Sequence, residues 1–579
     1  ARNKGITRKL QCRDAVHPPC ESTRVMRLAL LLLLVPGCVS LNILLFLLGT
    51  NQYERNTFEF LAQQLALRHH NVITVKPILI PEEPRLVKPK LHLVREKTLK
   101  NLLPKELYED LEKAGDVIPW KTNYEEEAYD EVYWTAHNAS CYKMINSNLI
   151  DTLQKDAIDV AIVYSGNPCQ LAIAYVLAVP VIYYDLEGLS DETLVASNSP
   201  LNLDITPSKC FLPEISCSSC HSLSRIRNGI CYMREYLVQS GIPFISKLIS
   251  RKYRQLDDPI STMFAEDYNF KKRFKNFPAT TTLLRSSSFF FANTDPLLEF
   301  PRALSPRVVP VGGLHIDHPK PLFAPWNTSI ESAKEGLIVV SLGTQANHAE
   351  MKESQVKAIL GALSKLTKYR IYWRIGHKVQ LKGVKEEDVP AHINLTAYIP
   401  QNDLLAHKSC KLLVTNGGMS SLMEAVAHGV PVVGIPLYGS NRHNLRKVVN
   451  KGLGMVVSKG ELTEETLLAA MNAVLQGVKY STVAKEMSKE YRSRSTSAFA
   501  TALHYIEHVG RHHGSAFLGH SPIHPLATLN FDFFIVVLVV LYILQYLISR
   551  IFCLLRCRRC SPAPQQAQPT KSRQAKKND

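Results

Sequence analysis

The fold is decided by the stretch "LLVTNGGMSSLMEAVAHGVPVVGIPLYGSN", residues 412–441. A short apolar run ends in a turn at Thr415-Asn416-Gly417-Gly418, and a helical segment follows over residues 419–428. A second apolar run, 430–437, then ends at Gly439-Ser440-Asn441. A strand that leads through a glycine turn into a helix presents free backbone N–H groups to an anion. The stretch therefore predicts an anion site in a parallel α/β sheet.

The same alternation of strands and helices continues on both sides of this stretch. Before it, strands are predicted over 41–49, 71–79, 158–164 and 180–186, with one helix face marked by Phe58, Leu61, Ala62 and Leu65. After residue 330, strands are predicted over 337–343, 369–376, 393–401 and 411–416, and helices over 350–367, 441–451 and 462–476. Residues 80–155 and 190–285 are less regular and charged, and we interpret them as excursions around a pocket. The predicted fold class is α/β, with two Rossmann-like domains facing a cleft.

The net charge of +17 over 579 residues is concentrated at the two ends of the chain. Residues 1–40 hold seven Lys or Arg against two Asp or Glu, a net of +5, and residues 550–579 hold eight against one, a net of +7. Residues 41–549 carry the remaining +5. No basic stripe with interleaved aromatic residues is present, so the composition argues against nucleic acid as a partner.

The two ends have the patterns of a secretory signal and a membrane anchor. "RVMRLALLLLLVPGCVS", residues 24–40, predicts a signal peptide cleaved after Ser40, with Met26 placed to be the initiator. A signal anchor is the alternative, because apolar residues resume at 41–48. "FFIVVLVVLYILQYLI", residues 533–548, predicts a transmembrane helix, and the basic residues after it predict a cytosolic tail. Lys576 and Lys577 match a dilysine signal for retrieval to the endoplasmic reticulum.

This topology places residues 41–530 in the lumen. Three sequons there are candidate glycosylation sites, at Asn138, Asn327 and Asn394. A cysteine cluster contains Cys210, Cys217, Cys220 and Cys231. Its Cys-x-x-Cys pair resembles half of a zinc site, but an oxidising lumen favours disulfides, so no metal site is predicted.

Several of these segments resemble motifs of the UDP-glycosyltransferase family, and most closely those of its animal, glucuronosyltransferase-like members. They are "LEFPRALSPRVVPVGGLH" (298–315), "VVSLGT" (339–344), "YIPQNDLLAH" (398–407), "EHVGRHHGSAFL" (507–518) and the opening stretch. The resemblance implies a GT-B fold, in which the N-terminal domain takes the acceptor and the C-terminal domain takes the UDP-sugar.

The resemblance and the segment pattern together predict the organisation of the chain. Residues 1–40 are the upstream segment and signal, 41–310 the acceptor domain, 311–330 the linker, 331–500 the UDP-sugar domain, 501–530 a return segment to the N-terminal domain, 531–552 the transmembrane helix and 553–579 the basic tail.

The predicted donor site gathers groups suited to a nucleoside diphosphate. Tyr398, where the family usually has Trp, is expected to stack on uracil, Gln401 to bond the nucleotide, and Glu424 to accept from the ribose hydroxyls. The backbone at Gly343, Thr344, Gly417 and Gly418 can approach the phosphates, with Ser420 and Ser421 as further donors. Asn416 replaces a family His that contacts the diphosphate, and Ser440 and Asn441 replace an Asp-Gln pair that binds the sugar.

The catalytic dyad of the family is not matched. Its general-base His aligns with Glu54 or Arg55, and its Asp aligns with Tyr164. Glu54 is the candidate substitute base, provided that its pKa is raised. His69 and His70 lie about 15 residues further along the same predicted helix, over ~20 Å away, and are interpreted as surface residues.

Two functions follow from these residues. The first is a membrane-anchored luminal enzyme of the endoplasmic reticulum that transfers a hexose or glucuronic acid from UDP to a small lipophilic acceptor, with inversion. It needs no cofactor besides the UDP-sugar, which is its donor substrate. The second is a relative with impaired chemistry that binds a ligand or regulates active family members, and a homo- or hetero-oligomer stays open.

Overall fold

The computed structural model describes residues 40–50, 52–80, 93–121, 126–200, 206–210, 222–331, 333–344, 346–376, 381–514 and 531–559. The chain divides into two compact units, Ala1–Ser40 and Leu41–Asp579, and everything below concerns the second. The signal peptide, Cys217, Cys220 and the dilysine pair lie outside the described residues.

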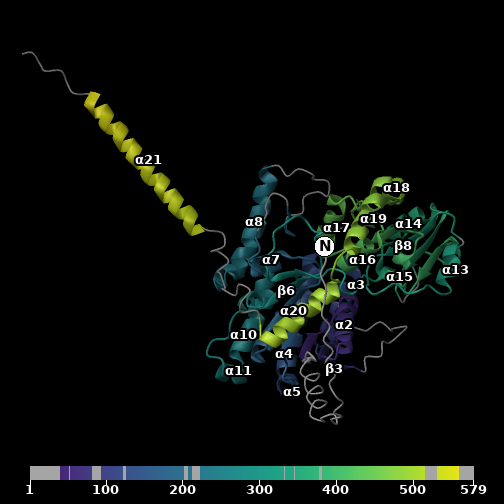
Figure 1. The fold of residues 1–579 in the computed structure, drawn as a ribbon, viewed down its shortest axis with the longest axis horizontal. Helices are drawn as coiled ribbons and strands as arrows, with labels where there is room; N and C mark the ends of the chain where they lie inside the picture. The colour runs from purple at the N-terminus through teal and green to yellow at the C-terminus, as the bar shows by residue number, and fades with distance from the viewer. Residues whose placement is uncertain are drawn as a thin grey trace, which may run out of the picture. The chain divides into compact units, whose positions relative to one another are not determined.

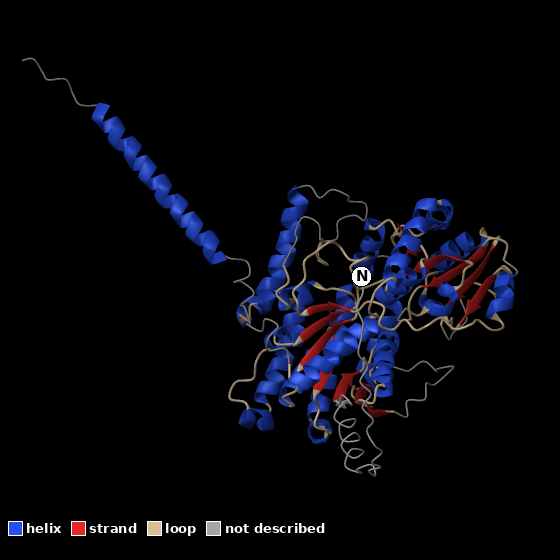
Figure 2. Cartoon of the chain, in the orientation of Figure 1, coloured by secondary structure: helices blue, strands red, loops and turns tan. Residues whose placement is uncertain are grey.

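The first half of this unit is built on a seven-stranded sheet in which every pairing is parallel (Figure 2). The strand order is β3-β2-β1-β4-β5-β6-β7. Its strands are β1 (Asn42–Phe46), β2 (Asn71–Pro77), β3 (Val94–Leu99), β4 (Val160–Tyr164), β5 (Val181–Asp185), β6 (Phe289–Ala292) and β7 (Val308–Pro310). The order reverses at β1, which pairs with both β2 and β4, and this is the strand order of a Rossmann sheet.

The second half repeats the arrangement in a six-stranded parallel sheet of order β10-β9-β8-β11-β12-β13. Its strands are β8 (Gly336–Ser341), β9 (Tyr369–Arg374), β10 (Ile393–Thr396), β11 (Cys410–Thr415), β12 (Val432–Gly434) and β13 (Gly454–Val456). The order reverses at β8, which pairs with β9 and β11. Ligands of open α/β sheets bind at the carboxyl ends of strands beside such a reversal.

Helices connect the strands in both halves (Figure 1). Those of the first half are α2 (Gln52–Leu67), α3 (Lys105–Val117), α4 (Glu126–Ile145), α5 (Leu149–Lys155), α6 (Pro168–Val176), α7 (Asp191–Ala196), α8 (Ser222–Gln239), α9 (Pro243–Ile249), α10 (Asp258–Glu266), α11 (Tyr268–Arg273) and α12 (Thr280–Arg285), with the short turns η1 (Ile118–Trp120) and η2 (Tyr253–Asp257). Those of the second are α13 (Trp326–Glu331), α14 (Glu353–Ser364), α15 (Gln401–Ala406), α16 (Met419–His428), α17 (Asn441–Asn450), α18 (Glu464–Gln476) and α19 (Val478–Arg492), with η3 (His348–Glu350) and η4 (Glu386–Asp388).

The predicted alternation of strands and helices is confirmed, and the predicted face of α2 is completely buried. Phe58, Leu61, Ala62 and Leu65 all have 0% exposure and pack on the first sheet. The final helix of the body, α20 (Ala498–His512), buries Ala502 in the same cluster, so it lies on the first sheet together with α2 (Figure 1).

Most of the described residues in 80–155 and 190–285 form helices α3–α5 and α7–α12, and the interpretation of these segments as excursions around a pocket stays a prediction. Their helical period is hard to see in the sequence. In α4, for example, the neighbours Ala136 and His137 are both buried, as are Ser140 and Cys141. Polar side chains that are buried through hydrogen bonds break the apolar spacing on which the prediction relied.

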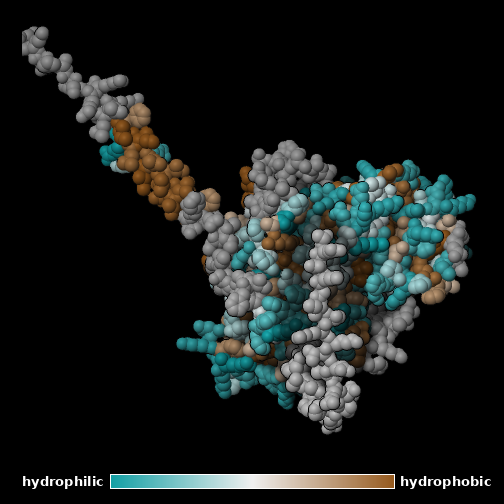
Figure 3. Space-filling model, in the orientation of Figure 1, coloured by the Kyte–Doolittle hydropathy of each residue, from teal (hydrophilic) through white to brown (hydrophobic). Residues whose placement is uncertain are grey.

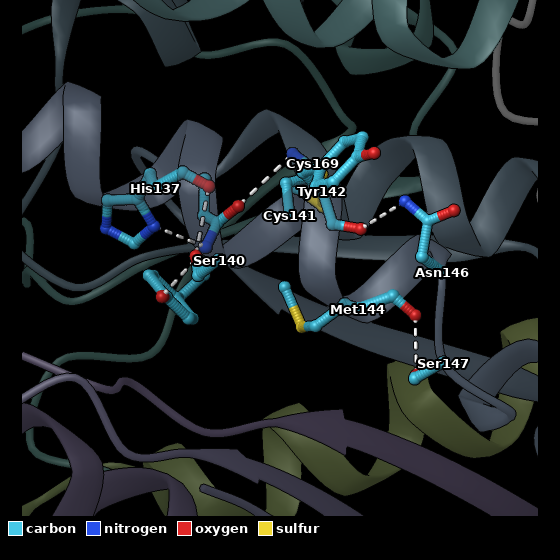
Figure 4. The surroundings of a disulfide bond; sticks show 10 residues. His137, Ser140, Cys141, Tyr142, Met144, Asn146, Ser147 and Cys169 are labelled. Carbon is cyan, nitrogen blue, oxygen red and sulfur yellow. Dashed lines mark hydrogen bonds between the residues drawn. A yellow bond between two sulfur atoms is a disulfide. The ribbon is translucent and has the colours of Figure 1, made fainter. Parts of the chain in front are cut away.

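Among the described residues, two disulfides cross-link segments of the first half. Cys141 in α4 bonds Cys169 in α6 (Figure 4). His137, on the same helix as Cys141, is hydrogen-bonded to Asn167. Cys210 bonds Cys231 in α8, which confirms the disulfide prediction for these two members of the cysteine cluster. The bond between Cys141 and Cys169 was not predicted, because their sequence neighbourhoods do not mark them as partners.

Helix α21 (Phe531–Arg559) contains a candidate membrane span at Phe534–Cys553, none of which is buried inside the protein. Its surface is apolar along the span (Figure 3). The helix continues to residue 559, so the first part of the predicted basic tail, 553–579, is helical.

Candidate functional site

The residues predicted to hold the donor lie at the carboxyl edge of the second sheet. Gly343 and Thr344 follow β8, Tyr398 follows β10, Asn416 follows β11, and Ser440 follows β12. Because all six strands are parallel, these four segments reach the same edge. The edge includes the reversal between β8 and β11, where a ligand is expected.

The loop after β8 comes close to the turn after β11. Gly343 has a φ of +89°, and a β-carbon there would lie 2.8 Å from the Nδ2 atom of Asn416. The Arg374 guanidinium, at the end of β9, donates to the Gly343 carbonyl oxygen at 3.0 Å. Glycine is therefore required at 343 by both conformation and space, and a buried cation lies directly behind the loop.

The turn after β11 leads into α16 without a side-chain cap. Gly417 has a φ of +91°, and a β-carbon there would collide with Leu445 at 2.5 Å. The Asn416 Oδ1 atom accepts weakly from the Gly418 N–H at 3.4 Å, while Nδ2 donates to the Oδ1 atom of Asn441 at 3.3 Å. Asn416 and Asn441, predicted separately, thus form one buried amide pair at the start of two helices.

Gln401 and Glu424 form the shortest hydrogen bond between two of the predicted donor-site residues. The Gln401 Nε2 atom donates to the Glu424 Oε2 atom at 2.6 Å and to the Ser421 Oγ atom at 3.0 Å. The second carboxylate oxygen of Glu424 lies 3.4 Å from the Nε2 atom of His315. Glu424 is 5% exposed and each carboxylate oxygen can accept a further bond, so the pair is suited to hydroxyl recognition.

Tyr398 is the one exposed aromatic side chain among the predicted donor-site residues, with 54% of its surface accessible. It follows β10, and Asp403 and Glu424 lie near enough for their charges, together with burial of the hydroxyl, to raise its pKa. An accessible ring next to Gln401 is the arrangement that a stacking partner for a planar base requires.

Ser420 and Ser440 are held by residues of the first half. The Asn293 Nδ2 atom donates to Ser420 Oγ at 3.1 Å, and Ser440 Oγ donates to the Glu187 carboxylate at 2.5 Å. Asn293 and Glu187 follow β6 and β5, so the carboxyl edges of the two sheets meet here. Burial would raise the pKa of Glu187, but the Lys209 ammonium and the Ser440 hydroxyl outweigh it and hold that pKa below its usual range.

A loop from the first half is anchored in the core of the second. Trp120 is 2% exposed inside the second hydrophobic core, and its Nε1 atom donates to the Asn347 carbonyl oxygen at 2.6 Å. The Gln355 Nε2 atom donates back to the Trp120 carbonyl oxygen at 3.0 Å. The Lys459 ammonium bonds the carbonyl oxygens of both Pro119 and Leu437. These contacts set how the two sheet edges face each other.

The residues predicted to replace the catalytic dyad lie in helix α2 and strand β4. Glu54 and Arg55 lie in the first turn of α2, where the side chain of Glu54 lies outside the described residues and Arg55 is 1% exposed. Tyr164 is completely buried, and its hydroxyl accepts from Asn167 Nδ2 at 3.1 Å. Tyr164 is therefore a core aromatic residue with a hydrogen bond, and it places no carboxylate at the end of β4.

The three sequon asparagines differ in their surroundings. Asn138 lies inside α4, and its Nδ2 atom donates to the Gln255 carbonyl oxygen at 2.6 Å. Asn327 is half-buried in α13, and Asn394 in β10 accepts from Arg370 at 2.5 Å. A glycan at Asn138 would have to displace its hydrogen bond, so glycosylation stays a prediction. Among the described residues, no group of three or more His, Cys, Asp or Glu is arranged to hold a metal.

Sequence reasoning missed four residues of this region: Trp120, Glu187, His315 and Arg374. Glu187 and Arg374 carry a usable signal, since each lies at the carboxyl end of a predicted strand. Trp120 and His315 carry none, because their roles depend on partners more than 100 residues away.

Two Rossmann sheets whose carboxyl edges meet define the GT-B class of glycosyltransferases, as predicted. The glycotransferase of kitacinnamycin, a solved structure, has this fold: it aligns with a TM-score of 0.50 over 81% of this chain and 98% of that one, at 15% identity.

The chain belongs to the family described as UDP-glucoronosyl and UDP-glucosyl transferase, whose sequence profile matches residues 65–563. It is 28% identical to a human 2-hydroxyacylsphingosine 1-beta-galactosyltransferase over 66% of this chain and 64% of that protein. It is 24% identical to human UDP-glucuronosyltransferase 1A3 over 66% of each chain, and 29% identical to UDP-glucosyltransferase 2 of Dactylopius coccus over 42% of this chain and 46% of that protein. The matches thus span just under two thirds of the relatives' length, or less.

Proposed function

We propose that this protein is a UDP-glycosyltransferase that moves a hexose or glucuronic acid from UDP to a small lipophilic acceptor. The observation that carries the proposal is the gathering of Gly343, Gln401, Asn416 and Glu424 at one sheet edge beside a strand-order reversal. The relatives include proteins named for galactosyl, glucosyl and glucuronosyl transfer, so the family alone leaves the sugar open.

The residues at this edge would divide the work of donor binding. Tyr398 would stack on the base, and the Gln401–Glu424 pair would bond the nucleotide and ribose. The uncapped first turn of α16 would receive the diphosphate, with Arg374 supplying positive charge from behind the Gly343 loop. The neutral Asn416 would donate a hydrogen bond without adding charge.

Proton removal from the acceptor is assigned to Glu54, as a proposal. A carboxylate that abstracts a proton needs a raised pKa. Glu187 also lies at the contact between the two sheet edges, but its pKa is lowered by Lys209 and Ser440 in spite of burial, which suits a hydrogen-bond acceptor better than a base. The α21 helix would anchor the enzyme in the membrane of the endoplasmic reticulum, with the body in the lumen.

The alternative is a family member that binds donor or acceptor without efficient transfer. The observations that favour it are the hydrogen-bonded core position of Tyr164 and the absence of a carboxylate at residue 440, whose hydroxyl is occupied by Glu187. This protein would then act as a ligand-binding or regulatory partner of active relatives.

One experiment separates the two. Purified full-length protein is melted with UDP-glucose, UDP-galactose, UDP-glucuronic acid or UDP-N-acetylglucosamine, and transfer to a panel of lipophilic alcohols and phenols is measured with the same donors. A donor present at 100 times its Kd stabilises the folded state by about 2.7 kcal/mol. Stabilisation with transfer supports the enzyme, and stabilisation without transfer supports the binding protein. If no donor shifts the melting temperature at millimolar concentration, the enzyme is overturned, and the alternative is reduced to a protein that does not bind the donor. Transfer that persists in Glu54→Gln would remove Glu54 from its role.

A further inference from the structure

Several strongly exposed apolar side chains lie on two helices of the first half. Ile226 and Ile230 on α8 are 60% and 63% exposed, and Phe244 and Leu248 on α9 are 77% and 68% exposed. Ile242, between the two helices, is 40% exposed. We call these five residues the α8–α9 patch. Single exposed apolar residues are ordinary, but a group of five large ones marks a binding surface.

The apolar side chains lie on two neighbouring helices. Ile226 and Ile230 are four residues apart on α8, as Phe244 and Leu248 are on α9, so each pair shares one helix face. Helices α8 and α9 pack against each other, and Ser246 is buried between them, where its hydroxyl donates to the Val238 carbonyl oxygen at 3.0 Å. The patch is therefore presented by a fixed helix pair.

The segment that carries the patch has a net positive charge. Residues 222–285 hold twelve Lys or Arg against five Asp or Glu, a net of +7. Residues 41–549 as a whole carry +5, so the rest of that stretch is at −2. On α8, Arg227 and Arg234 are exposed and lie seven residues apart, along one side of the stripe formed by Ile226 and Ile230. Apolar residues flanked by cations are typical of surfaces that lie on anionic membranes.

The length of the chain after the body limits how far this surface can be from a bilayer. The described body ends at residue 514, and α21 begins at Phe531. The 16 residues between them reach at most about 55 Å when fully extended. Once α21 spans a membrane, a tether of this length gives the patch a local concentration near the bilayer in the millimolar range, so a weak surface is enough.

We infer that the α8–α9 patch docks the body on the anionic surface of the membrane that α21 crosses. The apolar side chains enter the headgroup region, and Arg227 and Arg234 face the lipid phosphates and carboxylates. This inference rests on α21 as an anchor and does not depend on sugar transfer. A docked body would take its acceptor from the bilayer side, which fits a lipophilic substrate.

The test uses the full-length chain reconstituted in nanodiscs of phosphatidylcholine and phosphatidylserine. A photoreactive residue is introduced as Phe244→p-benzoylphenylalanine, and the matched control is Val478→p-benzoylphenylalanine on α19, where the native side chain is 76% exposed. Because the site is tethered near the bilayer, roughly tenfold more lipid adduct is expected at 244 than at 478. The double variant Arg227→Gln/Arg234→Gln should reduce the adduct at 244 several-fold, since cations near an anionic surface attract it.

The remaining outcomes overturn the inference. Equal lipid adducts at 244 and 478 would show that the patch does not touch the bilayer. A covalent dimer formed through residue 244 would assign the patch to a second copy of the chain. If nanodiscs of phosphatidylcholine alone give as much adduct at 244 as nanodiscs with phosphatidylserine, the patch does not recognise anionic lipid. Melting temperatures of all variants, measured beside the crosslinking, are expected to match the parent because every replaced side chain is exposed. Sugar transfer is not part of the readout, so the result stands apart from the proposed function.

Discussion

Gly343 and Asn416 face each other across the point where the strand order of the second sheet reverses, and only the absence of a side chain at 343 lets them do so. A β-carbon at residue 343 would lie 2.8 Å from the Nδ2 atom of Asn416. The loop after β8 and the turn after β11 are thereby brought together at the edge where the diphosphate is proposed to bind.

Gly343→Ala is therefore expected to disturb this edge in two ways, through strain in the backbone at residue 343 and through a clash with Asn416. A matched control is Gly376→Ala, because Gly376 has a φ of +82° and a β-carbon there would meet nothing within 4 Å. Both variants should lose about 1–3 kcal/mol from backbone strain. Only Gly343→Ala should also abolish the melting shift caused by a UDP-sugar. Equal donor shifts in the two variants would show that the close approach to Asn416 is irrelevant to binding.

Truncating the Trp120 side chain should cause a large loss of folding stability. Its indole fills the core of the second half, although it belongs to a loop of the first. Trp120→Ala is expected to lower the free energy of unfolding by about 3–5 kcal/mol, measured by urea denaturation. Trp120→Phe retains much of the packing but loses the hydrogen bond to Asn347, and should cost less. Similar losses in both variants would mean that the hydrogen bond, rather than the ring, holds the loop.

The ion pair between Glu299 and Lys447 is a second tie between the halves. The two side chains are 2.7 Å apart and at most 4% exposed. Glu299→Gln leaves a buried ammonium without its counter-ion, and should cost about 3–5 kcal/mol. The surface pair Glu353–Lys357, whose side chains are 56% and 69% exposed, supplies the control. Glu353→Gln should change the stability by less than about 1 kcal/mol, and a loss as large as that of Glu299→Gln would contradict the prediction.

Acid should destabilise the fold through histidines that are buried in their neutral form. Burial lowers the pKa of His348 to about 3, with a further contribution from Arg374, and burial lowers the pKa of His137 to about 3. Both start from 6.5 in the unfolded chain. The unfolded state therefore binds more protons between pH 6.5 and 3, so stability is complete above pH 6.5 and is lost as the pH falls.

The size of this effect can be measured at one residue. Each such histidine should remove up to about 1.4 kcal/mol per pH unit below its unfolded pKa. In urea denaturation at pH 7 and pH 5, His348→Asn should reduce the loss of stability between the two conditions by about 2 kcal/mol. Replacing the exposed His318 by Gln should leave the loss unchanged. A His348→Asn variant with the parent's pH dependence would rule out His348 as a source of acid sensitivity.

The sequence by itself determined the two α/β halves, the helix face of α2 and the segments that reach the donor edge. These features are local: strand and helix periods, glycine turns and the residues at strand ends can all be found within about 20 consecutive positions. The placement of Gly343, Gln401, Asn416 and Glu424 at one edge then follows from parallel strands alone.

Only the tertiary structure decided how the two halves meet. The Glu187–Ser440 bond joins residues 253 positions apart, and the Trp120–Asn347 bond joins residues 227 positions apart. Local sequence patterns do not predict such partners, because any polar side chain at a strand end could form a bond of this kind. The helices between residues 105 and 155 have no clear apolar period in the sequence, because buried polar residues such as His137 and Ser140 interrupt it. Asn416 illustrates the difference. Its place in a turn could be predicted from the sequence, but its hydrogen bond to Asn441 is seen only in the tertiary structure.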